Sequence, residues 1–146
     1  MARNGILIIG IGSPLRGDDA AGPAAARRLA ARGFRALNVH QLTPELAEEV
    51  ASAREVYFLD AHSELTPGEV SVEEITETER AIAVLEHRSS PAGLLRLVRT
   101  AYGAEPSAWL VSMGGRDFEL SERLTPEAEQ AVERAIEEVV RCTNQE

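Results

Sequence analysis

Short apolar runs alternate along the chain with stretches in which apolar residues recur at helical spacing. The runs predict β-strands at residues 6–9, 36–40, 56–59, 69–75 and 109–113. The helical spacing predicts helices at residues 18–32, 44–52, 91–102 and from 126 towards the end of the chain. This alternation predicts an α/β fold, a three-layer sandwich in which helices cover both faces of a mostly parallel, twisted sheet of about five strands. We expect a single domain spanning residues 1–146, because no linker or repeat interrupts the pattern.

Individual positions indicate where several of these elements lie. The run at 56–59 is apolar throughout, as in a central strand covered on both faces, and it ends at Asp60. Residues 69–75 alternate as in an edge strand. Residues 76–86 are acid-rich and weakly patterned, and we expect them to be irregular. The positions expected to face inward in the edge strand are Val70, Val72 and Ile75, and those in helix 91–102 are Leu94, Leu95, Leu97 and Val98.

Charge and composition narrow the classes of function. The net charge is −9 and all 15 basic residues are arginine, so a broad cationic face for nucleic acid or anionic membrane is not expected. No apolar stretch approaches the roughly 18 residues of a membrane span, and the first apolar run is too short for a signal peptide. Cys142 is the only cysteine. We therefore expect a cytoplasmic protein without disulfides.

Three polar groups are expected to converge on one rim of the sheet. In open α/β sheets, functional side chains collect at the carboxyl ends of the strands. The loop after the first strand carries Asp18 and Asp19, the central strand ends at Asp60, and His87 precedes the third long helix. Carboxylate oxygens with one imidazole nitrogen suit a borderline divalent ion such as nickel or zinc, and three protein ligands leave positions open for a substrate.

Each of these residues also has a structural interpretation, which the pattern alone leaves open. Asp18 or Asp19 could cap the following helix, Asp60 could belong to a turn, and His87 could be a surface residue. His62, two residues after Asp60, could join a metal site, although this spacing is a loose pattern. His40 ends the second strand, where a structural histidine is the simpler interpretation.

Nucleotide binding and phosphotransfer fit the sequence poorly. The segment Gly10-Ile11-Gly12 would need glycine at position 15 to form a dinucleotide fingerprint, and Leu15 stands there. A Walker loop and a phosphorylated receiver domain each require a lysine, which the chain lacks. The acidic loop therefore calls for another interpretation.

The segment from Gly10 to Gly22, GIGSPLRGDDAAG, resembles the G-x-G-N-x-L-x-x-D-[DE]-x-x-G motif of the hydrogenase maturation proteases. The resemblance continues in the same order through most of the chain, at residues 41–46, 59–61, 67–69, 87–95 and 124–127. Two positions depart from the family pattern: Ser13 replaces the usual asparagine, and Ala20 stands where glycine is common. Alanine would be strained at position 20 only if the backbone required a positive φ.

The resemblance implies an endopeptidase that removes the C-terminal extension of a nickel-containing hydrogenase large-subunit precursor. By position in the motifs, Asp19, Asp60 and His87 would be its catalytic and metal-contacting residues, and the loop from Gly10 to Gly17 would form part of the substrate cleft. Nickel would belong to the substrate, with cleavage after a basic residue and no dedicated serine or cysteine nucleophile. Metallocentre assembly chaperones are further expected partners.

Two alternatives to this function remain at this point. One is a non-catalytic chaperone that binds the nickel-loaded precursor without cutting it. The other is a hydrolase of the same fold that acts on an unrelated small substrate.

Overall fold

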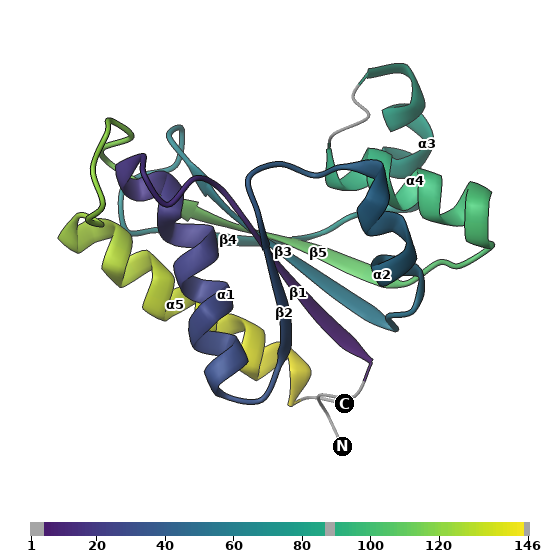
Figure 1. Ribbon diagram of the computed structural model, residues 1–146, viewed down its shortest axis with the longest axis horizontal. Coiled ribbons are helices and arrows are strands. Elements are labelled where there is room, and N and C mark those ends of the chain that lie inside the picture. The colour runs from purple at the N-terminus through teal and green to yellow at the C-terminus, as the bar shows by residue number, and fades with distance from the viewer. Residues whose placement is uncertain (1–4, 87–89, 145–146) are drawn as a thin grey trace.

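A single five-stranded sheet organises the chain, of which the computed structural model describes residues 5–86 and 90–144. The strand order is β2-β1-β3-β5-β4; β4 at one edge is antiparallel and the other strands are parallel (Figure 1). The predicted α/β class and the predicted edge strand are therefore confirmed. The strands are β1 (Ile6–Ile11), β2 (Arg35–Val39), β3 (Glu55–His62), β4 (Val70–Glu74) and β5 (Ser107–Gly114).

Helices form a layer on each face of this sheet (Figure 1). The long helices α1 and α5 pack together on one face, whereas α4 packs on the other face with α2 and α3 beside it. Within residues 5–86 and 90–144, no helix is both long and apolar enough to cross a membrane. The helices are α1 (Ala21–Ala31), α2 (Ala47–Ala51), α3 (Glu77–Glu86), α4 (Pro91–Tyr102) and α5 (Pro126–Thr143), and short 3₁₀ turns, η1 (Gly17–Ala20) and η2 (Pro44–Leu46), precede α1 and α2.

The central strand β3 contributes to a hydrophobic core on each side of the sheet. Tyr57 and Leu59 belong to the core under α1 and α5, and Val56 and Phe58 belong to the core under α2 and α4. This alternation follows from the two-residue period of a strand. Asp60 continues the series of Val56 and Phe58, so its side chain emerges on the face that carries α2, α3 and α4.

The prediction that residues 76–86 are irregular is wrong, because residues 77–86 form helix α3. Its beginning is stabilised by a capping box. The Glu79 amide donates to Thr76 Oγ1 at 3.2 Å, and the Glu79 carboxylate accepts from the Thr76 amide at 3.2 Å. The Thr-x-x-Glu spacing of this motif is present in the sequence and signals a helix start even where the apolar pattern is weak.

Three smaller predictions also need correction. The central strand does not end at Asp60 but continues to His62 in register with β5. Leu97 is 36% exposed rather than buried with the other apolar residues of α4. Ile75 is buried, but in the core opposite the one that Val70 and Val72 contact, because it is three residues from Val72 and side chains alternate between the two faces of a strand.

Helix α1 packs so closely on the sheet that one position admits only glycine. A Cβ atom at Gly22 would lie 2.4 Å from the Leu59 carbonyl oxygen and 2.5 Å from that of Ile11. Both contacts are with backbone, which cannot move aside as a flexible side chain could. The first turn of α1 is therefore held against the carboxyl ends of β1 and β3, where Asp60 lies.

We expect Gly22→Ala to lower the free energy of unfolding by about 2 kcal/mol or more, since the added methyl group overpacks this contact. Helix propensity alone predicts the opposite sign, a gain of about 1 kcal/mol for alanine in a helix interior. Urea denaturation of both proteins decides between the two effects. A variant more stable than the parent would show that α1 does not pack this closely.

Candidate functional site

The loop after β1 holds the carboxylate of Asp19 at the carboxyl end of the sheet. Gly12 makes this possible: its φ is +143°, and a Cβ atom there would lie 1.9 Å from the Asp19 carbonyl oxygen. Asp19 Oδ2 accepts a hydrogen bond from the Ser13 amide at 2.7 Å. Within the described part of the chain, no hydrogen bond reaches the other carboxylate oxygen, Oδ1, so one oxygen is available to a ligand.

The two departures from the family motif are compatible with this loop. Ser13 supplies its backbone amide to Asp19, and its hydroxyl accepts a hydrogen bond from the Leu15 amide at 3.3 Å. Ala20 has a φ of −79°, in the right-handed region that any residue adopts. Neither position therefore needs the residue that the family more often has.

Asp60 lies close enough to Asp19 for the two carboxylates to repel each other. Burial and the charge of Asp19 raise the pKa of Asp60 to about 6, against smaller opposing effects of His62 and the Ala61 amide. Both effects disfavour the charged form of a carboxyl group, burial by removing it from water and Asp19 by repulsion between like charges. The predicted convergence of the loop acid with the strand acid is thus present in the structure.

The adjacent Asp18 has a structural role. Its side chain is completely buried, and four hydrogen bonds end on its carboxylate. Oδ2 accepts from the amides of Arg116 (2.7 Å) and Asp117 (3.0 Å) and from the Thr125 hydroxyl (2.7 Å), and Oδ1 accepts from the Thr125 amide (2.8 Å). Burial alone would raise the pKa of Asp18, but the donors outweigh it and hold that pKa below its ordinary value. Asp18 therefore fastens the loop after β1 to the loop after β5 and to the start of α5.

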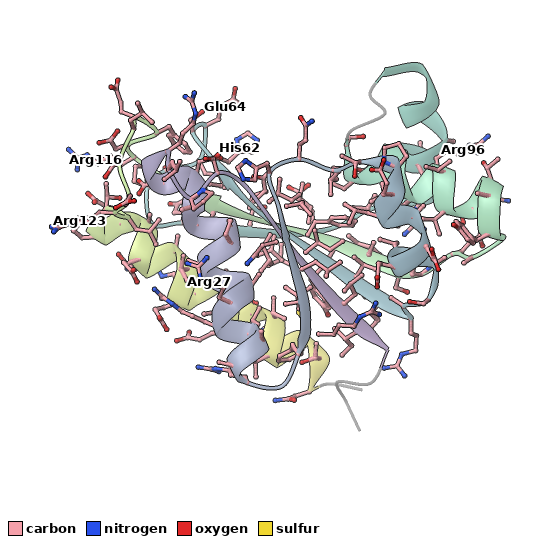
Figure 2. The ribbon with its side chains drawn as sticks, viewed as in Figure 1. Arg27, His62, Glu64, Arg96, Arg116 and Arg123 are labelled. Atoms are coloured by element: carbon pink, nitrogen blue, oxygen red, sulfur yellow. The ribbon has the colours of Figure 1, made fainter. Side chains whose placement is uncertain are left out.

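The histidines have different positions relative to this acidic pair. His87, the third predicted metal contact, lies outside the described residues. His62 is exposed and near enough to Asp60 to lower its pKa, and Figure 2 shows it at the end of the sheet where β3 terminates. His40 is exposed just beyond β2. Among the described residues, no three histidine, cysteine or acidic side chains are grouped so that they could hold a metal ion.

An open hollow of about 380 Å³ adjoins Asp60. Phe118, from the loop after β5, forms one wall of it. The residues of that loop follow neither strand nor helix spacing, so the hydrophobic pattern predicts no function for it. The sequence signal for a role of this loop is the pair Gly114-Gly115, where the last strand ends. A Cβ atom at Gly115 would lie 2.8 Å from both Asp18 Cβ and the Phe118 ring. The residues that line the hollow are Asp60, Ala61, His62, Ser63 and Phe118.

Solved structures with this architecture are known. The [NiFe] hydrogenase maturation protease HybD from Thermococcus kodakarensis superposes with a TM-score of 0.77 and 25% identity, over 94% of this chain and 98% of that one. The chain has the fold of the hydrogenase maturation proteases. The maturating endopeptidase HybD from E. coli (TM-score 0.77, 24% identity, 96% and 92% coverage) and the hydrogenase 2 maturation peptidase from a Thaumarchaeota archaeon (0.71, 24%, 97% and 99%) share it.

The structural comparison confirms the resemblance to hydrogenase maturation proteases that the sequence motifs indicate. By sequence, no family model and no curated protein matches this chain. The likeness therefore lies in the arrangement of the backbone and in short motifs at the carboxyl ends of the strands.

Removal of the Asp18 carboxylate is expected to destabilise this maturation-protease fold strongly. In Asp18→Ala four donors lose their acceptor, and we expect a loss on the order of 3 kcal/mol at pH 7. Because the folded-state pKa is lowered, the stability that Asp18 contributes is present above the unfolded pKa and is lost as pH falls through the folded value. The difference between the proteins should accordingly persist at pH 5 and shrink below about pH 4.

Urea denaturation across this pH range measures the effect. Asp117→Ala is the matched control, because the exposed Asp117 carboxylate accepts, among the described residues, only a local hydrogen bond from the Glu119 amide. We expect Asp117→Ala to lower the free energy of unfolding by less than about 1 kcal/mol. Equal losses for the two variants would contradict the structural role of Asp18.

The pH dependence of the stability that Asp60 contributes should have the opposite sign to that of Asp18. Its folded-state pKa of about 6 exceeds the ordinary value of 3.8, so the native state is favoured with Asp60 protonated and loses that advantage as pH rises through 6. Asp60→Asn in the presence of a chelator is expected to stabilise the protein by about 1–3 kcal/mol at pH 8, and by much less at pH 4. Chemical denaturation at both pH values tests this, and a gain that is independent of pH would argue against the raised pKa.

Proposed function

We propose that this protein is an endopeptidase that removes the C-terminal extension from a nickel-containing hydrogenase large-subunit precursor. One observation carries the proposal: Asp19 and Asp60 are brought together at the carboxyl edge of a sheet whose fold matches the HybD proteases. Carboxylates that repel each other in the free protein are well placed to receive a cation. In this proposal the cation is the nickel ion already inserted into the precursor.

The proposed contacts to nickel are Asp19, Asp60 and His87. Support from the described residues comes from Asp19 Oδ1, to which they donate no hydrogen bond, and from Asp60, which borders an open hollow. Asp60 faces the helical layer in which α3 ends at Glu86, the residue before His87. Two carboxylates and one imidazole form a donor set that suits nickel, and they leave positions for the ligands of the precursor itself.

The chemistry of the site favours hydrolysis without a covalent intermediate on cysteine. Cys142 is near Glu55, at the opposite end of β3 from Asp60, so its thiol is far from the acidic pair. The carboxylates of Asp19 and Asp60 would hold the nickel-bearing part of the precursor so that its following segment lies against the loop from Gly10 to Gly17. When bound, the ion would supply polarisation of the scissile carbonyl or of an attacking water.

Neutral replacements of either acid should stop processing while the protein stays folded. We expect Asp19→Asn and Asp60→Asn to slow cleavage of the nickel-loaded precursor by about 100-fold or more, since loss of even a supporting residue at a metal site costs roughly 10–100-fold. Mass spectrometry of the precursor after incubation reports the loss of one defined C-terminal peptide. The nickel-free precursor should keep its mass with every variant.

Glu48→Gln is the matched control, because Glu48 is an exposed acid on α2 and lies outside the site. It should process at the parental rate. Retained cleavage by Asp19→Asn would count against the proposed role of this acid. If the parent protein bound the loaded precursor and protected its tail without cutting it, the function would instead be that of a non-catalytic chaperone.

A further inference from the structure

Thr125, the residue before helix α5, uses its hydroxyl group in two hydrogen bonds at once. Thr125 Oγ1 accepts from the Ala128 amide at 3.2 Å and donates to Asp18 Oδ2 at 2.7 Å. The first of these bonds is that of an ordinary helix N-cap, in which the side chain acts only as an acceptor. The second bond is not needed for capping. The residue at position 125 therefore has a further role besides starting the helix.

Among the described residues, four groups donate to the Asp18 carboxylate, and only the Thr125 hydroxyl belongs to a side chain. The other three are the backbone amides of Arg116, Asp117 and Thr125 itself, which nearly every residue type supplies. Serine, asparagine and aspartate cap a helix at least as well as threonine does. An ionised aspartate, however, only accepts hydrogen bonds, and at position 125 it would place a second carboxylate against Asp18.

The short turn that carries Asp18 also carries Asp19, and it is held on two sides. On one side, the Asp18 carboxylate joins it to the start of α5. On the other side, the Asp19 carbonyl lies close against Gly12, and the Asp19 carboxylate accepts from the Ser13 amide. Each residue of the turn has only two soft backbone dihedral angles, so a displacement of Asp18 moves Asp19 as well. A carboxylate at position 125 would repel Asp18 and shift Asp19 away from the Ser13 amide.

We infer that Thr125 is a positioning residue for the proposed reaction. Its hydroxyl holds Asp18, and through Asp18 it fixes the direction in which Asp19 presents Oδ1 to the nickel ion of the precursor. The single O–H donor of Thr125 is used by Asp18, so Thr125 acts on the reaction only through the turn. The inference rests on the proposed function for the role of Asp19, whereas the link from Thr125 to Asp19 can be measured without a substrate.

Two substitutions separate positioning from helix capping. Thr125→Ser keeps the hydroxyl, and we expect its kcat/KM for the nickel-loaded precursor to lie within about twofold of the parental value. Thr125→Asp keeps the cap but loses the donor, and we expect kcat/KM to fall by about 10-fold or more, as at other supporting residues of metal sites. If Thr125 only caps α5, both variants should cleave as the parent does, and that result would overturn the inference.

The amide resonance of Ser13 reports the position of Asp19 in the absence of substrate, because this amide donates to Asp19 Oδ2 at 2.7 Å. In proton–nitrogen NMR spectra, Thr125→Asp should shift this resonance and raise the hydrogen-exchange rate of the amide by about 10-fold or more. Thr125→Ser should leave both unchanged. Val139→Ala is the matched control, since Val139 is buried near the other end of α5 and its truncation destabilises the protein away from the turn.

Thr125→Val decides the matter if Thr125→Asp does not fold, since valine keeps the shape of the side chain and loses the hydroxyl. It should shift the Ser13 resonance and lower kcat/KM, whereas Val139→Ala should do neither. An unchanged Ser13 resonance in a folded Thr125→Asp or Thr125→Val protein would overturn the inference. If the Ser13 resonance shifts as expected but the parent cleaves no precursor, the link between Thr125 and Asp19 is upheld and the proposed function alone is refuted.

Discussion

Four donors converge on the buried carboxylate of Asp18, and they come from residues 98 to 107 positions further along the chain. The Thr125 hydroxyl both donates to Asp18 and accepts from the Ala128 amide, so the first turn of α5 is capped and tethered by one side chain. A charged group removed from water is tolerated only when its hydrogen bonds are satisfied, as they are here. The positions of Asp19, Phe118 and Leu120 all depend on the loops that this carboxylate joins.

Close packing of backbone against backbone at two glycines also positions the site. The absence of a side chain at Gly22 allows α1 to approach β1 and β3, and its absence at Gly12 allows the Asp19 carbonyl to approach the loop. Close packing thus explains why glycine stands at Gly12 and Gly22 of the opening motif, and binding of a nucleotide is not needed to explain it. Their spacing brings the start of α1 to the strand ends, where a carboxylate on the loop can meet one on β3.

Much of the fold could be predicted because strand and helix periods are local properties of the sequence. The apolar run before Asp60 is buried on both faces as expected, and the pairing of Asp19 with Asp60 follows from parallel strands ending at one edge. The apolar pattern of helix α3 is too weak to predict a helix, although the sequence contains its capping box. The role of the loop after β5 could not be predicted, since it depends on hydrogen bonds to Asp18 across about 100 residues of chain.

Asp18 and Asp19 show why a pair of adjacent acids cannot be interpreted by composition alone. In the 3₁₀ turn η1 consecutive side chains point in different directions, so one carboxylate enters the protein and the other remains at the rim. The buried carboxylate has every oxygen engaged and a lowered pKa, which keeps it charged and excludes it from binding a ligand. The carboxylate at the rim has one oxygen held by the Ser13 amide, and this fixes its orientation while leaving the other oxygen for chemistry. Asp18 therefore stabilises the loop, and the neighbouring Asp19 carries the reactive carboxylate. Because both belong to the same turn, the hydrogen bonds that hold Asp18 also fix the position of the Asp19 carboxylate.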